Sequence, residues 1–249
     1  MIKNPSFYSV IIGTELLNGR REDEHFAFLN SELIKRGFEH KANFVIKDDP
    51  DFLKDVFELV LLDPHSVMFS FGGIGATADD FTREVASLAF TKQSAVCHKD
   101  AKKIIIDRLG DKAYPHAIKM ANIPKNSTLI PNPINKMPGF QLDNRFFFVP
   151  GFPQMAHPMI INTLDAHYPK NIKKYSCNFL AHCSEGILID IMEALPTGIE
   201  LSCLPAFDGD KRSAEIYLAH FDKELLLSWE KFFQDELRKK NIYFDIIAN

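Results

Sequence analysis

Short apolar runs alternate with longer amphipathic segments through the first part of this chain. Runs of strand length occupy residues 7–12, 41–46 and 66–71. Between them, residues 24–36 and 50–62 carry apolar side chains at helical spacing. Strands that alternate with helices of this length form βαβ units, because parallel neighbours need a crossover connection. The pattern therefore predicts an α/β fold with a mostly parallel sheet.

The pattern changes after residues 168–171, whose Tyr-Pro-Lys-Asn sequence is typical of a linker. From residue 174 onward the predicted order is strand, helix, strand, strand, helix, strand, which is the split βαβ arrangement. We therefore predict two domains: an α/β domain over residues 1–170 and a small α+β domain over residues 171–249. Because the second domain lacks a glycine-rich loop, we expect it to have a structural, interface or substrate-shaping role.

Composition excludes several classes of protein. The 249 residues are 46% hydrophobic and 25% charged, an ordinary globular mixture, and the net charge is −4. Without a basic surplus, nucleic-acid binding is not expected. The longest apolar runs are far shorter than the ~20 residues of a membrane span. The N-terminus lacks the pattern of a signal peptide, so a cytoplasmic location is expected. The 22 phenylalanines are expected to fill the core.

A glycine-rich loop follows the third predicted strand. Gly72, Gly73 and Gly75 lack the Cβ that would keep a ligand away from the backbone, and glycine tolerates positive φ. Successive amide groups, with Thr77, can then surround an anion, and a helix predicted over 81–90 would add its N-terminal dipole. The spacing is neither a Walker loop nor a dinucleotide fingerprint, and a tight structural turn explains it equally well.

Acidic residues follow three of the predicted strands. Glu15, Asp48, Asp79 and Asp80 fall where the carboxyl ends of parallel strands meet at one edge of a sheet. Carboxylates beside a phosphate favour a hard divalent cation, so this edge is predicted to bind a metal. Each position also has a structural interpretation: Asp80 as a helix N-cap, Asp48 as a turn residue and Glu15 as a surface carboxylate.

Several separate segments occur together in a recognisable order and spacing. They are residues 13–19, Asp23, Asp48, and residues 72–82, 132–133, 138–140 and 150–153. Over about residues 5–168 they resemble the molybdopterin-binding-like domain of the competence/damage-inducible protein A (CinA) family. Residues 174–249 resemble the small α/β domain that follows in short family members. The expected form is therefore the short one, without the nicotinamide-nucleotide deamidase domain and without deamidase activity.

The resemblance implies the three-layer fold shared with molybdopterin adenylyltransferases, and a dimer or trimer. Taken with the residue pattern, it predicts Asp48 and Asp80 as catalytic residues. Glu15, Asp79 and Asp80 are predicted to hold Mg²⁺, Mn²⁺ or Co²⁺. The positions predicted to bind phosphate or another part of the ligand are Gly13, Thr14, Gly72, Gly73, Gly75, Thr77, Thr82, Asn132, Gly139 and Gly151.

The chain departs from the family pattern at three places. Ala76 stands where the loop commonly has proline, Glu24-His25 stands where Thr-Asn is usual, and Met155 stands where longer members carry glutamate. The first change is expected to alter loop stiffness. The other two remove polar groups near the predicted site.

Three hypotheses about function follow. The leading one is a divalent-metal-dependent pyrophosphatase that acts on ADP-ribose, FAD or a related dinucleotide. The second is a molybdopterin-binding protein, or an adenylyltransferase that joins AMP to molybdopterin, in molybdenum cofactor biosynthesis. The third is a non-catalytic protein that binds a nucleotide or a pterin, with no turnover.

Overall fold

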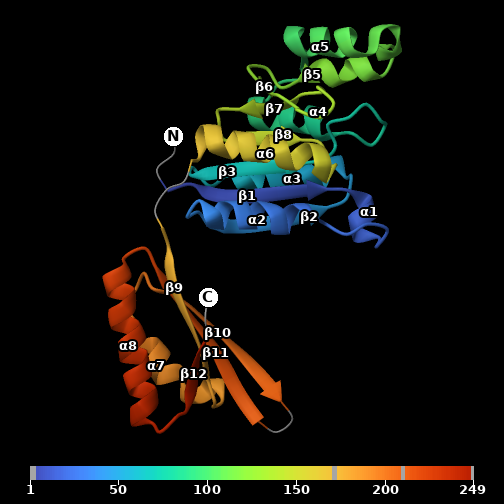
Figure 1. Ribbon diagram of the computed structural model, residues 1–249. Coiled ribbons are helices and arrows are strands. Elements are labelled where there is room, and N and C mark those ends of the chain that lie inside the picture. The colour runs from blue at the N-terminus through green and yellow to red at the C-terminus, as the bar shows by residue number, and fades with distance from the viewer. Residues whose placement is uncertain (1–3, 170–172, 209–210, 248–249) are drawn as a thin grey trace. The chain divides into compact units, whose positions relative to one another are not determined.

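The computed structural model describes residues 4–169, 173–208 and 211–247. It divides the chain into two compact units, Met1–Asn171 and Ile172–Asn249. Figure 1 draws the first unit in blue to yellow and the second in orange to red. Within the described ranges, no helix is both long and apolar enough to cross a membrane.

A six-stranded sheet forms the centre of the first unit, with the strand order β2-β1-β3-β8-β7-β6. Its strands are β1 Ser6–Ile12, β2 His40–Ile46, β3 Ser66–Phe71, β6 Thr128–Ile130, β7 Gly139–Leu142 and β8 Phe146–Val149. The first four strands in the order are parallel, whereas β7 and β6 continue the sheet antiparallel. The predicted α/β fold with a mostly parallel sheet is confirmed.

Helices cover both faces of this sheet and make three layers (Figure 1). One face packs against α2 (His25–Lys35) and α6 (Pro153–His167), which contribute Leu29, Leu33 and Ile160 to the core. The other face packs against α3 (Pro50–Leu61), α4 (Thr82–Ala86) and the π-helical turn η1 (Ser87–Thr91). A four-residue helix, α1 (Thr14–Leu17), follows β1. The layers leave the loops after β1, β2, β3 and β8 at one edge of the sheet.

Phenylalanine fills the core on both faces, as the composition indicated. On one face the rings of Phe69 and Phe147 stack with centroids 4.9 Å apart. On the other face Phe140 and Phe148 stack at 4.5 Å. All four side chains are buried. Burial of so much aromatic surface makes the sheet a rigid support for the loops at its edge.

A small lobe is inserted between η1 and β6. It consists of β4 Val96–Cys97, α5 Lys99–Leu109, η2 Gly110–Ala113, η3 Ala117–Ala121 and β5 Asn122–Ile123. Its own core is formed by small and branched residues, among them Ala101 and Ile105. Arg83 of α4 is buried, and its guanidinium donates a hydrogen bond to the backbone carbonyl of Lys119. This contact ties η3, and with it the lobe, to the helix that follows the glycine-rich loop.

The second unit is a four-stranded antiparallel sheet with helices packed against one face. Its elements are β9 Tyr175–Ala181, η4 Glu185–Ile187, α7 Ile189–Glu193, β10 Glu200–Asp208, β11 Lys211–His220, α8 Lys223–Lys239 and β12 Phe244–Ile247. The strand order is β10-β11-β9-β12, and Phe179, Ile216 and Phe233 fill its core. The predicted alternation of strands and helices is confirmed.

Candidate functional site

The loop after β3 is built on two glycines with positive φ. Gly72 has φ +97° and Gly73 has φ +68°, a region that side chains with a Cβ rarely adopt. A Cβ on Gly73 would overlap the hydroxyl of Thr82. Thr82 in turn donates to the Gly72 carbonyl at 3.0 Å through its hydroxyl and to the Gly73 carbonyl at 3.0 Å through its amide. The glycines therefore let the loop fold back tightly onto the start of α4.

The carboxylate of Asp80 holds the rest of this loop. It accepts hydrogen bonds from the amide groups of Gly75 and Thr77, at 2.8 and 2.7 Å, and from the Thr77 hydroxyl at 2.5 Å. It does not cap α4, whose N-cap residue Phe81 has no side-chain hydrogen bond. The N-cap interpretation of Asp80 is therefore wrong, since its oxygens face the loop. The Asp80 carboxylate therefore already accepts hydrogen bonds from two of the amide groups that were predicted to surround a phosphate.

Removing the Asp80 carboxylate gives a first test of this loop geometry. We expect Asp80→Ala to destabilise the first unit by about 1–3 kcal/mol, because two amides and a hydroxyl lose a charged acceptor. Hydrogen exchange at the amides of Gly75 and Thr77 should become faster by at least roughly tenfold, as local opening becomes easier. Asp55→Ala is the control, since Asp55 is an exposed acid on α3 of the same unit, away from the loop. Equal exchange rates in both variants would contradict the contacts described.

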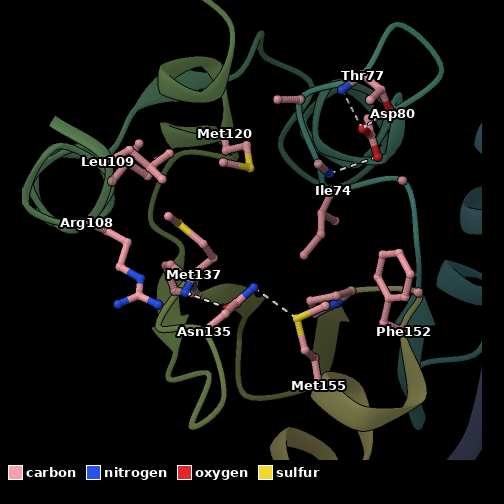
Figure 2. A pocket seen from close by; sticks show the side chains of 17 residues that line it. Ile74, Thr77, Asp80, Arg108, Leu109, Met120, Asn135, Met137, Phe152 and Met155 are labelled. Atoms are coloured by element: carbon pink, nitrogen blue, oxygen red, sulfur yellow. Dashed lines mark hydrogen bonds between the residues drawn. The ribbon is translucent and has the colours of Figure 1, made fainter. Parts of the chain in front are cut away.

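A cavity of about 680 Å³ lies between this loop, the lobe and the turn after β8. Figure 2 shows Ile74, Thr77 and Asp80 on one side of it and Leu109 and Arg108 of α5 on another. The complete lining is Gly73, Ile74, Gly75, Ala76, Thr77, Asp80, Ile105, Arg108, Leu109, Met120, Asn135, Met137, Pro138, Pro150, Gly151, Phe152 and Met155. The cavity brings together the predicted ligand-binding residues Gly73, Gly75, Thr77 and Gly151 with Asp80, which was predicted as a catalytic and metal-binding residue.

An amide side chain links two parts of the cavity wall. Asn135 accepts a hydrogen bond from the Met137 amide at 2.9 Å and donates one to the sulfur of Met155 at 3.0 Å. The buried Asn132 accepts bonds from the amides of Ile134 and Asn135, so it holds the turn that presents Asn135. Asn132 therefore supports the cavity from behind and does not line it. Met155, where polarity was expected to be lost, accepts the hydrogen bond from Asn135 through its sulfur and lines the cavity.

Several other predicted ligand-binding residues lie outside the cavity and have structural contacts. Gly139 is buried in β7, where a Cβ would meet the Phe148 carbonyl oxygen at 2.4 Å. Gly72 and Thr82 lie beneath the loop, as described above. Gly13 and Thr14 begin α1 after β1. The prediction that these residues contact a ligand stays untested.

Asp48 and Glu15 do not share the cavity with Asp80. The Asp48 carboxylate accepts hydrogen bonds from the amide and hydroxyl of Thr14, at 2.8 and 2.7 Å. It follows β2, which is two strands away from β3 in the sheet, so roughly 10 Å separates the two strand ends. Glu15 lies 3.9 Å from the guanidinium of Arg21. The predicted convergence of acidic side chains at one point is therefore not observed.

The acidic side chains also do not fit a resident metal ion. Among residues 4–169, 173–208 and 211–247, no group of three or more His, Cys, Asp or Glu side chains is placed to hold one. Asp79 is exposed, and both oxygens of Asp80 are engaged by the loop. The donor set expected for Mg²⁺, Mn²⁺ or Co²⁺ is several oxygens around one point. A metal site formed by Glu15, Asp79 and Asp80 alone is not supported by this geometry.

His25 fixes the turn after β8 at the rim of the cavity. Its ring Nε2 lies 3.2 Å from the Gly151 carbonyl, and the ring stacks on Phe71 with centroids 4.4 Å apart. The side chain is buried, and its Nδ1 has no partner among the described residues. Nε2 must carry the proton to donate to Gly151. Burial lowers the pKa of His25, although the Gly151 carbonyl opposes that shift.

The burial of His25 predicts a pH dependence of stability. Because the pKa of His25 is lower in the folded than in the unfolded state, its stabilisation is complete above the unfolded value of about 6.5 and declines as pH falls below it. We expect the urea midpoint to fall between about pH 7.5 and about pH 5.5, and to fall less in His25→Gln. If the urea midpoints of wild type and His25→Gln fell by the same amount over this pH range, the contribution of His25 to the pH dependence of stability would be contradicted.

The cavity residues contributed by the lobe were not predicted from the sequence. Arg108, Leu109 and Met120 reach it from α5 and η3. In the sequence, Arg108 is one basic residue at the end of an amphipathic helix, with no spacing that sets it apart. Residues 134–137 were also not predicted to line the site. They lie between two segments that resemble the family, residues 132–133 and 138–140, and that position was a usable signal.

Comparison with known proteins shows which family the first unit matches. Residues 9–167 match the family described as "Probable molybdopterin binding domain". A putative competence-damage inducible protein of Clostridium kluyveri is 31% identical over 172 residues, which are 66% of this chain and 40% of that protein. Protein Ta0487 of Thermoplasma acidophilum is 28% identical over 259 residues, covering 96% of this chain and 92% of that protein. The chain thus spans less than half of the Clostridium relative.

A solved structure of a CinA protein agrees with this family match. The crystal structure of the CinA protein from Thermoplasma acidophilum, titled as having unknown function, has a TM-score of 0.58 and 27% identity, covering 65% of this chain and 98% of that chain. The molybdopterin biosynthesis enzyme MoaB from Thermus thermophilus has a TM-score of 0.42 and 17% identity, covering 68% and 92%. The family match covers most of the first unit and includes the glycine-rich loop. The chain therefore belongs to the family of the probable molybdopterin binding domain, in its CinA-like branch.

Proposed function

We propose that the first unit binds a small phosphorylated heterocycle, a pterin phosphate or a nucleotide, in the cavity between the glycine-rich loop and the lobe. One observation carries this proposal. A cavity of about 680 Å³ lies between the glycine-rich loop and an arginine with no partner among the described residues. That volume lies within the roughly 300–1,000 Å³ of typical small-molecule sites.

The lining suits a flat ring system. Met120, Met137 and Met155 present thioethers, and Ile74 and Phe152 add further apolar surface (Figure 2). Thioethers pack favourably against aromatic rings because sulfur is polarizable. A few polar groups among apolar ones are the usual composition of a ligand pocket. The name of the matching family supports a pterin as one such ligand.

Binding is the part of the function that the geometry supports best. Adenylyl transfer to molybdopterin and hydrolysis of ADP-ribose or FAD both use ligands of this class, and both stay predictions. Among the described residues no acidic cluster forms a metal site, so the proposal covers binding and assigns these residues no catalytic step.

Titration calorimetry with AMP, ADP-ribose and neopterin monophosphate tests the proposal. We expect at least one of them to bind, and Met137→Trp to weaken that binding by at least about tenfold, since a larger side chain would occupy the cavity. Leu17→Trp is the control, because Leu17 is exposed on α1 and outside the cavity. Absence of binding by all three compounds, or equal binding to both variants, would overturn the proposal.

A further inference from the structure

The cavity carries one charged side chain on each of two opposite walls. Among the 17 described residues that line it, Asp80 is the one acid and Arg108 the one base. Figure 2 shows Asp80 beside Thr77 on one side and the guanidinium of Arg108 on the other, with methionine side chains between them. Because the two charges are opposite in sign, a ligand with a charged end would favour one orientation in the cavity.

The two charges differ in how they are satisfied. Asp80 accepts three hydrogen bonds from Gly75 and Thr77, so the loop amides already have their anion. Arg108 is exposed where it lines the cavity and makes no hydrogen bond or ion pair with any residue of the described ranges, so a ligand would displace only water from its five N–H groups. A second anion beside the loop would meet the charge of Asp80. An anion at Arg108 would meet a free cation.

We propose that Arg108 is the residue that binds the anionic group of the ligand, and that the ring system points toward the Asp80 side of the cavity. The proposal rests on the proposed function and deepens it, because it assigns an orientation to the phosphorylated heterocycle. It also reverses the orientation predicted from the glycine-rich loop, in which the loop amides bind the phosphate.

The remaining polar groups agree with this orientation. Oδ1 of Asp80 accepts one hydrogen bond, from Gly75, and a carboxylate oxygen can accept a second. Pterins and adenine carry an exocyclic amino group that can donate such a bond. The side-chain amide of Asn135 has one hydrogen bonded to Met155 and a second available to a ring nitrogen or carbonyl. The guanidinium of Arg108 can bind a phosphate through two parallel hydrogen bonds.

A structural role for Arg108 makes a different prediction. It lies in the last turn of α5, where a positive charge interacts favourably with the helix dipole. If that were its whole role, Arg108→Ala would lower stability and would affect ligands with and without phosphate equally. A comparison of such ligand pairs therefore separates the two roles.

The experiment measures the affinities of two matched pairs, AMP with adenosine and neopterin monophosphate with neopterin. In wild type, the phosphorylated member of at least one pair is expected to bind more tightly. Arg108→Ala should reduce that phosphate preference by about tenfold, the effect of losing charge-assisted hydrogen bonds. Lys103→Ala, which removes a charge from an exposed position of the same helix, should leave the preference unchanged. Thr77→Ala, which alters the loop wall of the cavity, tests the alternative in which the loop binds the phosphate.

The outcomes distinguish this inference from the proposed function. Failure of every compound to bind wild type would overturn both. Binding with an unchanged phosphate preference in Arg108→Ala would overturn the inference and leave the proposed function in place. Loss of the preference in Thr77→Ala, with Arg108→Ala unaffected, would place the phosphate at the loop. A circular dichroism spectrum and unfolding midpoint for each variant show whether it is folded.

Discussion

Replacing Phe148 with alanine is expected to destabilise the first unit by about 3–5 kcal/mol, since a large ring is removed from a site that cannot collapse. Phe148 lies on β8 with no exposed surface, and its ring contacts Phe57, Phe90 and Phe140 at centroid distances of 5.8, 5.7 and 4.5 Å. The lost surface and the lost ring contacts add to each other. Urea unfolding followed by circular dichroism measures the change.

The control for this prediction is another phenylalanine of the same unit. Phe52 lies on α3 and is 52% exposed. Phe52→Ala should change the free energy of unfolding by no more than about 0.5 kcal/mol, as is usual for surface substitutions. Similar effects of the two substitutions would contradict the assignment of Phe148 to the core.

Replacing Gly73 with alanine is expected to weaken ligand binding and to lower stability. The left-handed conformation of Gly73 costs a residue with a Cβ of the order of 1–3 kcal/mol, and the new Cβ would also overlap the Thr82 hydroxyl. Relief of the overlap must move the loop away from α4, and with it the wall formed by Ile74 and Thr77. We expect the affinity for AMP or neopterin monophosphate to fall by more than about tenfold, since binding depends on a pre-formed wall.

Gly19→Ala provides a matched control for this variant. Gly19 also has a positive φ, of 77°, but no heavy atom lies within 4 Å of the position that its Cβ would take. This variant should lose only about 1 kcal/mol through the backbone conformation and bind both compounds normally. Equal loss of binding in the two variants would show that the close approach of Gly73 to Thr82 does not shape the site.

The centre of the sheet could be predicted from the sequence because β1, β3 and β8 are buried almost throughout and read as continuous apolar runs. The three parallel strands β1, β3 and β2 begin and end within two residues of the predicted apolar runs. The hairpin was indicated by Asp143-Asn144, and both residues have the positive φ of a type I′ turn. The helix predicted over 81–90 is instead a short α-helix followed by a π-helical turn. There the Thr91 hydroxyl donates to the Ser87 carbonyl, a contact that hydrophobic periodicity does not reveal.

The site could be predicted only in part, for physical reasons. The glycine pattern located the loop, because the positive φ at positions 72 and 73 strongly favours glycine. Nothing in the pattern says whether the carboxylate of Asp80 faces a ligand or its own loop, since both arrangements use the same spacing. The distance between Asp48 and Asp80 also depends on the strand order, which the sequence pattern did not reveal: β1 lies between β2 and β3. Arg108 reaches the cavity only because the lobe folds over it.

A crystal structure with AMP or neopterin monophosphate, at a concentration well above its measured Kd, would show whether this cavity is the functional site. We expect the compound inside the cavity lined by Ile74, Met120 and Met137, with its phosphate at Arg108. A compound bound instead at the ends of β1 and β2, beside Thr14 and Asp48, would contradict the claim that this cavity is the functional site.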